Sequence, residues 1–192
     1  GVIDCGNGTR RVFTGWSGDA TGSGLTSDPI LMNANKTAVA VWKTQYYLTM
    51  STNAGSVSPV SGWFDSGANV TISASPPSSG SWIWNGWSGS GSGSYSGSAN
   101  PYWVVMNGPI SEVASWTQQI HDVAPTAVSA APSTVCQGDS VTFNVTVTNF
   151  GSETETFNVS CYYDNTWICN HTVSGLASGM STSFSCLWDT TG

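Results

Sequence analysis

A Gly-Trp-Ser-Gly motif occurs twice in this chain and sets the scale on which the chain is organised. The motif stands at residues 15–18 and again 71 residues later, at residues 86–89. The likeness continues beyond the motif, because residues 32–42 (MNANKTAVAVW) correspond to residues 106–116 (MNGPISEVASW). Two matching blocks in the same order and at nearly the same offset indicate an internal repeat of 71–74 residues.

The second copy is predicted to be a small, mostly antiparallel β module spanning residues 45–119. Its segments alternate apolar and polar residues, and glycine, proline and serine separate them, as is typical of short strands. The predicted strands cover residues 46–52, 68–74, 82–87, 101–106 and 112–116. The last two are expected to form a hairpin around the turn sequence Asn-Gly-Pro. No amphipathic pattern of helical length occurs, so the pattern predicts an all-β fold.

The first copy, residues 1–44, has no counterparts of the strands predicted at 46–52 and 68–74. A sheet without those two strands would expose unpaired edges and half of its core. We therefore expect one of two arrangements. Either the sequence is a window of a longer polypeptide, or a neighbouring chain supplies the missing strands.

The third region, residues 120–192, is predicted to be an immunoglobulin-like β-sandwich. Its segments recur at the spacing of 8–12 residues that is typical of such sandwiches. The predicted strands cover residues 122–130, 141–149, 155–163, 166–173 and 181–188. Within the second of them Val141, Phe143, Val145 and Val147 share one face. Such sandwiches have about seven strands, so we expect this domain to be incomplete at the C-terminus.

Motifs in different parts of this chain resemble those of two known families. With "FTGWSGD", "ILMNANKTAVAVW" and "YYLTMSTNAGSVSP", residues 1–118 resemble the divergent internalin-type B-repeat of archaeal and bacterial cell-surface proteins. The second copy departs from the family pattern at Ile110-Ser111, where a basic residue and Thr are usual, and it lacks a counterpart of Asp19. With "PSTVCQGDSVTFNVTVTNFG" and "WDTTG", residues 121–192 resemble CARDB, a cell-adhesion-related immunoglobulin-like domain. The combination resembles archaeal surface proteins, and both resemblances imply an extracellular spacer, adhesive or filament-forming protein without catalysis.

The scarcity of charge excludes several partners. Charged residues make up 8% of the chain, with four Lys and Arg in total and a net charge of −7. No basic cluster is available to neutralise phosphates, so neither nucleic acid nor an anionic membrane surface is an expected partner. No run of 18 apolar residues occurs, so we expect no insertion of this segment into a membrane.

The cysteines point to an oxidising, extracellular location. Four of the five fall in the last 57 residues, without the spacing of a metal site, so no metal or other cofactor is expected. Four cysteines permit three pairings. We favour Cys161–Cys169, across a predicted hairpin, with Cys136–Cys186 closing a loop of about 50 residues that is worth about 4 kcal/mol. The CARDB resemblance does not supply this pairing, because the commoner family pattern lacks cysteines. Cys5 is expected to be unpaired or to form an intermolecular bond.

Six Asn-x-Ser/Thr sequons mark candidate glycosylation sites, and any that are used must lie on the surface of an exported protein. They begin at Asn7, Asn35, Asn69, Asn144, Asn158 and Asn170.

The ten tryptophans admit two interpretations. Several recur at equivalent positions of the two copies, where each would bury 150–250 Å² and replace part of an aliphatic core. We favour this core role for Trp82 and Trp84 as well, with a sugar-stacking platform as the alternative.

No catalytic residues are predicted, because the repeated motif matches neither a phosphate-binding loop nor a nucleophile elbow. The sequence therefore predicts a non-enzymatic extracellular structural protein of a cell surface: a stalk, surface layer or filament subunit. Self-association by exchange of strands between subunits is the expected mode of assembly. A carbohydrate-binding or adhesin module of a larger secreted protein is the alternative.

Overall fold

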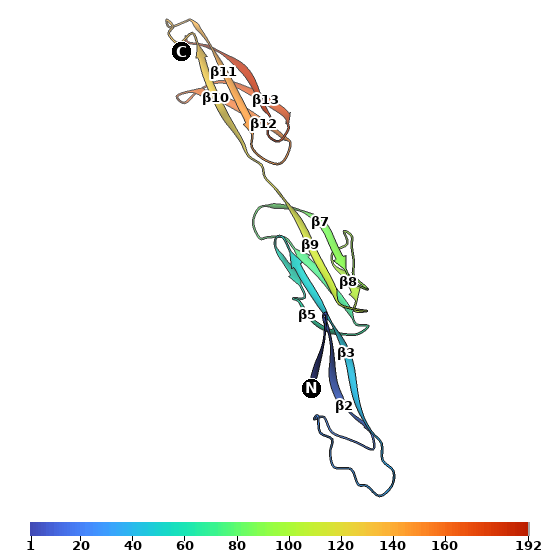
Figure 1. Cartoon of the computed structure of the whole chain (residues 1–192). Coiled ribbons are helices and arrows are strands. Elements are labelled where there is room, and N and C mark those ends of the chain that lie inside the picture. The colour runs from blue at the N-terminus through green and yellow to red at the C-terminus, as the bar shows by residue number, and fades with distance from the viewer. Residues whose placement is uncertain (192) are drawn as a thin grey trace. The chain divides into compact units, whose positions relative to one another are not determined.

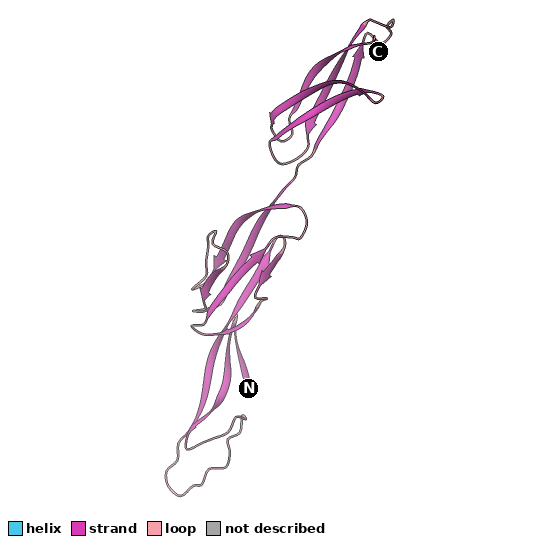
Figure 2. Ribbon diagram, turned by 180° about the vertical axis from the view of Figure 1, so that it is seen from behind, coloured by secondary structure: helices cyan, strands magenta, loops and turns pink. Residues whose placement is uncertain are grey.

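The computed structural model describes residues 1–191, and strands and loops make up all of this part of the chain (Figure 2). The all-β prediction is therefore confirmed. The chain divides into two compact units, Gly1–Thr117 and Gln118–Gly192. Within residues 1–191, no helix is long and apolar enough to span a membrane.

The first unit contains two sheets. The larger has the order β1-β2-β3-β9-β7, with β5 pairing to β3, and the smaller has the order β4-β6-β8. The strands are β1 (Val2–Gly6), β2 (Thr9–Gly18), β3 (Ala38–Thr52), β4 (Ser56–Ser58), β5 (Gly62–Asp65), β6 (Asn69–Ser75), β7 (Ser81–Ser90), β8 (Tyr102–Val105) and β9 (Ile110–Gln119).

The long strand β3 belongs to both copies of the repeat (Figure 1). Its first part, residues 38–46, pairs antiparallel with β2 of the first copy. Its last part, residues 48–52, pairs in parallel with residues 110–114 of β9. The boundary expected between residues 44 and 45 thus falls inside a continuous strand, and one sheet joins the two copies.

The prediction of a hairpin between residues 101–106 and 112–116 is wrong. Strand β8 pairs with β6 in the smaller sheet, whereas β9 pairs with β3 in the larger one. The physical reason is burial on both sides of the turn, since Met106 and Ile110 are both almost fully buried. The turn between them carries the chain from one sheet across the core to the other.

The core of the first unit belongs mainly to the second copy. Its buried side chains come from both sheets, with Leu48, Ile72, Val104 and Met106 among the least exposed. Along β9 every second residue from Ile110 to Trp116 is buried. This is the period that a strand with one face on a core requires.

The second unit is a sandwich of two sheets, with orders β10-β11-β14 and β12-β13. The strands are β10 (Val123–Ala131), β11 (Ser140–Asn149), β12 (Glu155–Tyr163), β13 (Thr166–Leu176) and β14 (Ser181–Asp189). All five predicted strands are present, and Val141, Val145 and Val147 are buried while Phe143 packs against the same core. The predicted inward face of this segment is therefore confirmed.

The outer face of the sheet β10-β11-β14 is covered by hydroxyl groups. Thr146 and Ser183 share a hydrogen bond of 2.8 Å between their hydroxyls, and Thr148 and Ser181 share another of 2.8 Å. Such cross-strand pairs stabilise a sheet without charge. They explain how a chain so poor in charged residues presents a polar surface.

Candidate functional site

The two copies of the Gly-Trp-Ser-Gly motif build the same aromatic cluster. In the first copy the Phe13 ring meets those of Trp16 and Trp42 edge-on, at 5.7 and 5.3 Å between centroids. In the second copy Trp84 lies 5.6 Å from Trp87 and 4.8 Å from Trp116. Because equivalent positions of the two copies hold aromatic rings in equivalent contacts, the repeat in the sequence is also a repeat in the structure. The motif supplies a packed tryptophan in both copies.

The last glycine of each motif is required because other groups approach its Cα closely. A Cβ on Gly18 would lie 2.5 Å from the carbonyl oxygen of Thr37. A Cβ on Gly89 would clash with the backbone carbonyl oxygen of Tyr95 and would lie 2.7 Å from both carboxyl oxygens of Glu112. Any larger residue would have to displace these groups, so the motif is explained by packing in both copies.

Asp19 shows why the second copy departs from the family pattern at two positions at once. Its carboxylate accepts hydrogen bonds from the Thr37 backbone N–H at 2.9 Å and from Lys36 Nζ at 3.2 Å. These two bonds, the backbone one first, lower the pKa of Asp19. The second copy has Ile110 where the first has Lys36, and Ile110 is buried in the core. The second copy therefore has neither partner of the exposed ion pair, and an apolar residue stands at the Lys36 position.

Glu112 is a buried acid that the sequence did not single out. Its exposed fraction is 0%, and it lies on β9 between the buried residues Ile110 and Ala114. Oε1 accepts a 2.7 Å hydrogen bond from the Tyr95 backbone N–H, whereas Oε2 has no partner among the described residues. Burial raises the pKa of Glu112, and the Tyr95 bond opposes this only in part. The sequence signal that could have identified Glu112 as buried was its place in the alternating pattern of β9, where every second residue faces the core.

The raised pKa of Glu112 makes the first unit less stable as the pH rises. The unfolded chain releases this proton near the ordinary value of 4.5, and the folded chain holds it to higher pH. Above that value the free energy of unfolding therefore falls by up to about 1.4 kcal/mol per pH unit, until the pH passes the folded pKa. Urea denaturation from pH 4 to 9 should show this fall in the wild type and not in Glu112→Gln. The same pH slope in both proteins would contradict the assignment.

Trp82 and Trp84 both pack against the core of the first unit. Their indole N–H groups donate hydrogen bonds to the carbonyl oxygens of Ser79 and Ser98, at 2.9 and 2.8 Å. A different aromatic group faces solvent. Trp103 is 59% exposed and stacks on Tyr102, with the two ring planes 7° apart.

An apolar groove lies between the two sheets of the second unit, bordered by β10 and β12. It has a volume of about 230 Å³ and continues into a second hollow of about 240 Å³. Its apolar lining includes Pro125, Val128, Phe143, Val145, Val159 and Ile168. Within residues 1–191, β12 pairs only with β13 and β10 only with β11, so both strands that border the groove have a free edge.

Comparison with known families matches two regions of the chain to domain families. Residues 46–120 match the model of the divergent InlB B-repeat domain. Residues 122–192 match CARDB. Both predicted resemblances are confirmed over these residues, which for the B-repeat are those of the second copy, and the two domains are typical of cell-surface or adhesion-related proteins. No curated protein and no solved structure gives a significant match to the chain.

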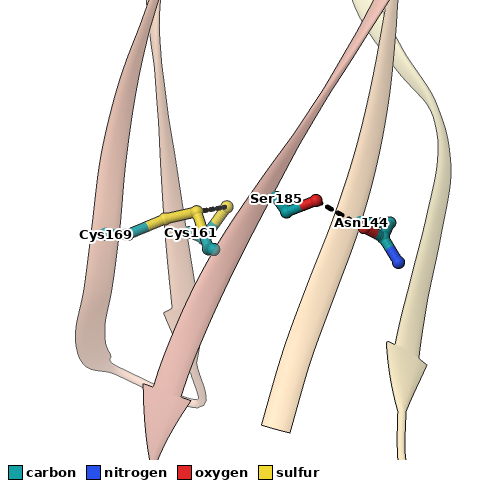
Figure 3. Close-up of a disulfide and its surroundings, with 5 residues drawn as sticks. Asn144, Cys161, Cys169 and Ser185 are labelled. Atoms are coloured by element: carbon teal, nitrogen blue, oxygen red, sulfur yellow. Dashed lines mark hydrogen bonds between the residues drawn. A yellow bond between two sulfur atoms is a disulfide. The ribbon is translucent and has the colours of Figure 1, made fainter.

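The disulfide of the CARDB domain differs from the predicted pairing. Cys169 of β13 is bonded to Cys186 of β14, with 6.2 Å between their Cα atoms (Figure 3). The hairpin does place Cys161 directly opposite Cys169. The predicted pairs are nevertheless wrong, because Cys186 reaches the same point from the other sheet.

The remaining cysteines are not bonded to one another within the described residues. Cys5 and Cys136 are exposed thiols, and Cys161 is a half-buried thiol that lines the groove. Sequence reasoning missed this arrangement because it paired the two hairpin cysteines with each other and so left Cys186 to Cys136, whereas the packing of two sheets decides which sulfur atoms meet.

All six sequon asparagines are exposed, as glycosylation would require. Two of them share the outer face of the β12–β13 sheet in the CARDB domain. There the side chain of Asn158 accepts a 2.7 Å hydrogen bond from Thr172, which is the hydroxyl residue of the Asn170 sequon.

Proposed function

We propose that this chain is a non-enzymatic structural segment of an extracellular cell-surface protein, and that it assembles by adding a β-strand from a neighbouring copy to the CARDB groove. The observation that carries the proposal is the combination of an apolar groove with a free strand edge on each side of it. The two surface-protein domains support the location. The proposal covers a stalk, a surface layer or a filament, since each uses repeated contacts between copies.

The groove has the chemistry that recognises an extended strand. Backbone N–H and C=O groups at the free edge of β12 are available to a ladder of hydrogen bonds with an added strand. Successive side chains of a strand point in opposite directions, so every second one would enter the groove. Val128 and Val159 offer apolar contacts to those side chains from the two sheets.

The first repeat offers a second apolar surface to a neighbouring copy. Val39 and Val41 lie on one face of β3, and both are exposed. Their counterparts in the second repeat are Val113 and Ser115, which lie on the face of β9 opposite to its buried residues, so the smaller sheet covers this face in neither repeat. Exposed apolar residues of this kind are typical of protein–protein contacts.

Sedimentation velocity and electron microscopy test assembly through the groove. The wild type is expected to form larger particles as its concentration rises. Val128→Glu is expected to remain monomeric, because it places a charge in the groove at a residue that is 64% exposed and so tolerates change. The matched control is Ala127→Glu, since Ala127 is the exposed neighbour on the same strand and does not line the groove. A wild type that stays monomeric at every concentration would overturn the proposal, as would normal assembly of Val128→Glu.

A second candidate function is glycan binding, and the exposed ring of Trp103, stacked on the half-buried rings of Tyr102 and Tyr95, favours it. The Tyr95 and Tyr102 ring centroids lie 3.7 Å apart, and Trp103 extends the stack outward. Flat exposed aromatic faces suit the C–H groups of sugar rings. A glycan array would support this function if binding were lost in Trp103→Ala and kept in Trp82→Ala. The absence of any glycan signal for the wild type would rule against it.

A further inference from the structure

Three sulfur atoms meet at one place in the CARDB domain. Cys161 and Cys169 are direct neighbours across the β12–β13 hairpin, and Cys186 reaches them from β14 of the other sheet. The Sγ atoms of Cys161, Cys169 and Cys186 all lie within 4.8 Å of one another. The Cys161 thiol lies 3.9 Å from the bonded sulfur of Cys186 (Figure 3).

We propose that these cysteines form a thiol–disulfide exchange site in which Cys186 is the shared sulfur and its partner alternates between Cys169 and Cys161. A thiolate next to a disulfide is the reacting pair of this exchange. The geometry favours it because both candidate partners of Cys186 sit at one rung of the same hairpin.

The exchange needs no external oxidant or reductant. Cys161 gives its proton to solvent, and the electron pair of the thiolate attacks Cys186 Sγ. The Cys161–Cys186 bond forms as the Cys169–Cys186 bond breaks. Cys169 leaves as a thiolate and takes up a proton, so one disulfide and one thiol are present before and after the step.

The two disulfides have the same structural effect, and they differ in where the free thiol stands. Cys161 belongs to β12 and Cys169 to β13, so either bond to Cys186 joins the sheet β12-β13 to the sheet β10-β11-β14. A Cys161–Cys169 bond would instead link only the two strands of the hairpin. Exchange therefore keeps the covalent link between the sheets while it moves a reactive thiol into the groove, at Cys161, or out of it.

Peptide mapping of trapped disulfides tests the exchange on the full chain with Cys5 and Cys136 replaced by Ser. The protein is equilibrated at pH 8, its free thiols are alkylated at mildly acidic pH, and it is digested with pepsin without reduction. Pepsin is suited because no Lys or Arg follows Lys43, whereas Tyr162, Tyr163 and Trp167 lie between Cys161 and Cys169. The expected result is alkylation of Cys161 in some molecules and of Cys169 in others. Alkylation of Cys161 alone, at every time of equilibration, would overturn the proposal.

Single variants in the same background give an independent test. In a glutathione redox buffer, Cys169→Ser is expected to contain a Cys161–Cys186 bond, and Cys161→Ser a Cys169–Cys186 bond. The matched control is Cys186→Ser, which is expected to have no disulfide between the two sheets. If Cys169→Ser folds with the circular dichroism of the parent and yet leaves Cys161 and Cys186 both free, the proposal is wrong.

Discussion

Asn149→Ala is expected to lower the free energy of unfolding of the CARDB domain by about 3 kcal/mol. Asn149 is 0% exposed and lies at the end of β11. Its Nδ2 donates to the carbonyl oxygens of Glu153 and Leu176, at 2.7 and 2.9 Å, and its Oδ1 accepts from the Gly151 N–H at 2.8 Å. Alanine would leave the carbonyl oxygens of Glu153 and Leu176 and the N–H of Gly151 without these hydrogen bonds in the interior of the domain. Each lost bond costs about 1 kcal/mol, which gives the expected total.

Urea denaturation followed by tryptophan fluorescence measures this loss, since Trp167 and Trp188 lie in the same domain. The matched control is Asn144→Ala on the same strand. Asn144 is exposed, and its side chain accepts one hydrogen bond, from Ser185. We expect the control to change stability by less than about 1 kcal/mol. Equal effects of the two variants would contradict the stabilising role given to the three buried hydrogen bonds of Asn149.

Trp87→Ala is expected to cost about 3–5 kcal/mol of stability in the first unit. The Trp87 side chain is 4% exposed and packs in the core between the two sheets. Trp16 is its counterpart in the first repeat, where it is half-buried and donates its indole N–H to the carbonyl oxygen of Gly24 at 2.9 Å. We expect Trp16→Ala to cost at least about 1–2 kcal/mol less, because less buried surface is lost.

The comparison of these two variants is made within one chain and one unit, by urea denaturation under identical conditions. It separates two explanations of the repeated motif. A larger loss for Trp87→Ala would mean that the second repeat has the complete core and the first repeat depends on its hairpin and loop contacts. Equal losses would mean that both copies bury their tryptophan equally in solution.

The strands of the CARDB domain were predictable because their signal is local. The alternation from Val141 to Val147 fixes which face of β11 meets the core, and turn sequences fix where strands end. The opposition of Cys161 and Cys169 was predictable for the same reason, because a hairpin brings together residues that are close in sequence.

The predictions that failed concerned contacts between sheets. Strand β8 has the pattern of a strand, yet nothing local shows that it joins β6 and not β9. Cys186 and Glu112 raise the same difficulty, since their neighbours come from elements far away in the chain. The groove, too, became visible only when the two sheets of the sandwich were placed together, because its lining comes from four different strands.

The central claim is that the free edge of β12 receives a strand from another copy. Hydrogen exchange of backbone amides tests it most directly, measured at a low concentration and at one where particles form. In the dilute chain the β12 amides that face the groove edge should exchange rapidly. At high concentration they should slow by at least about tenfold, while the amides of β11, already paired on both sides, change little. Assembled particles whose β12 amides exchange as fast as those of the monomer would contradict the account.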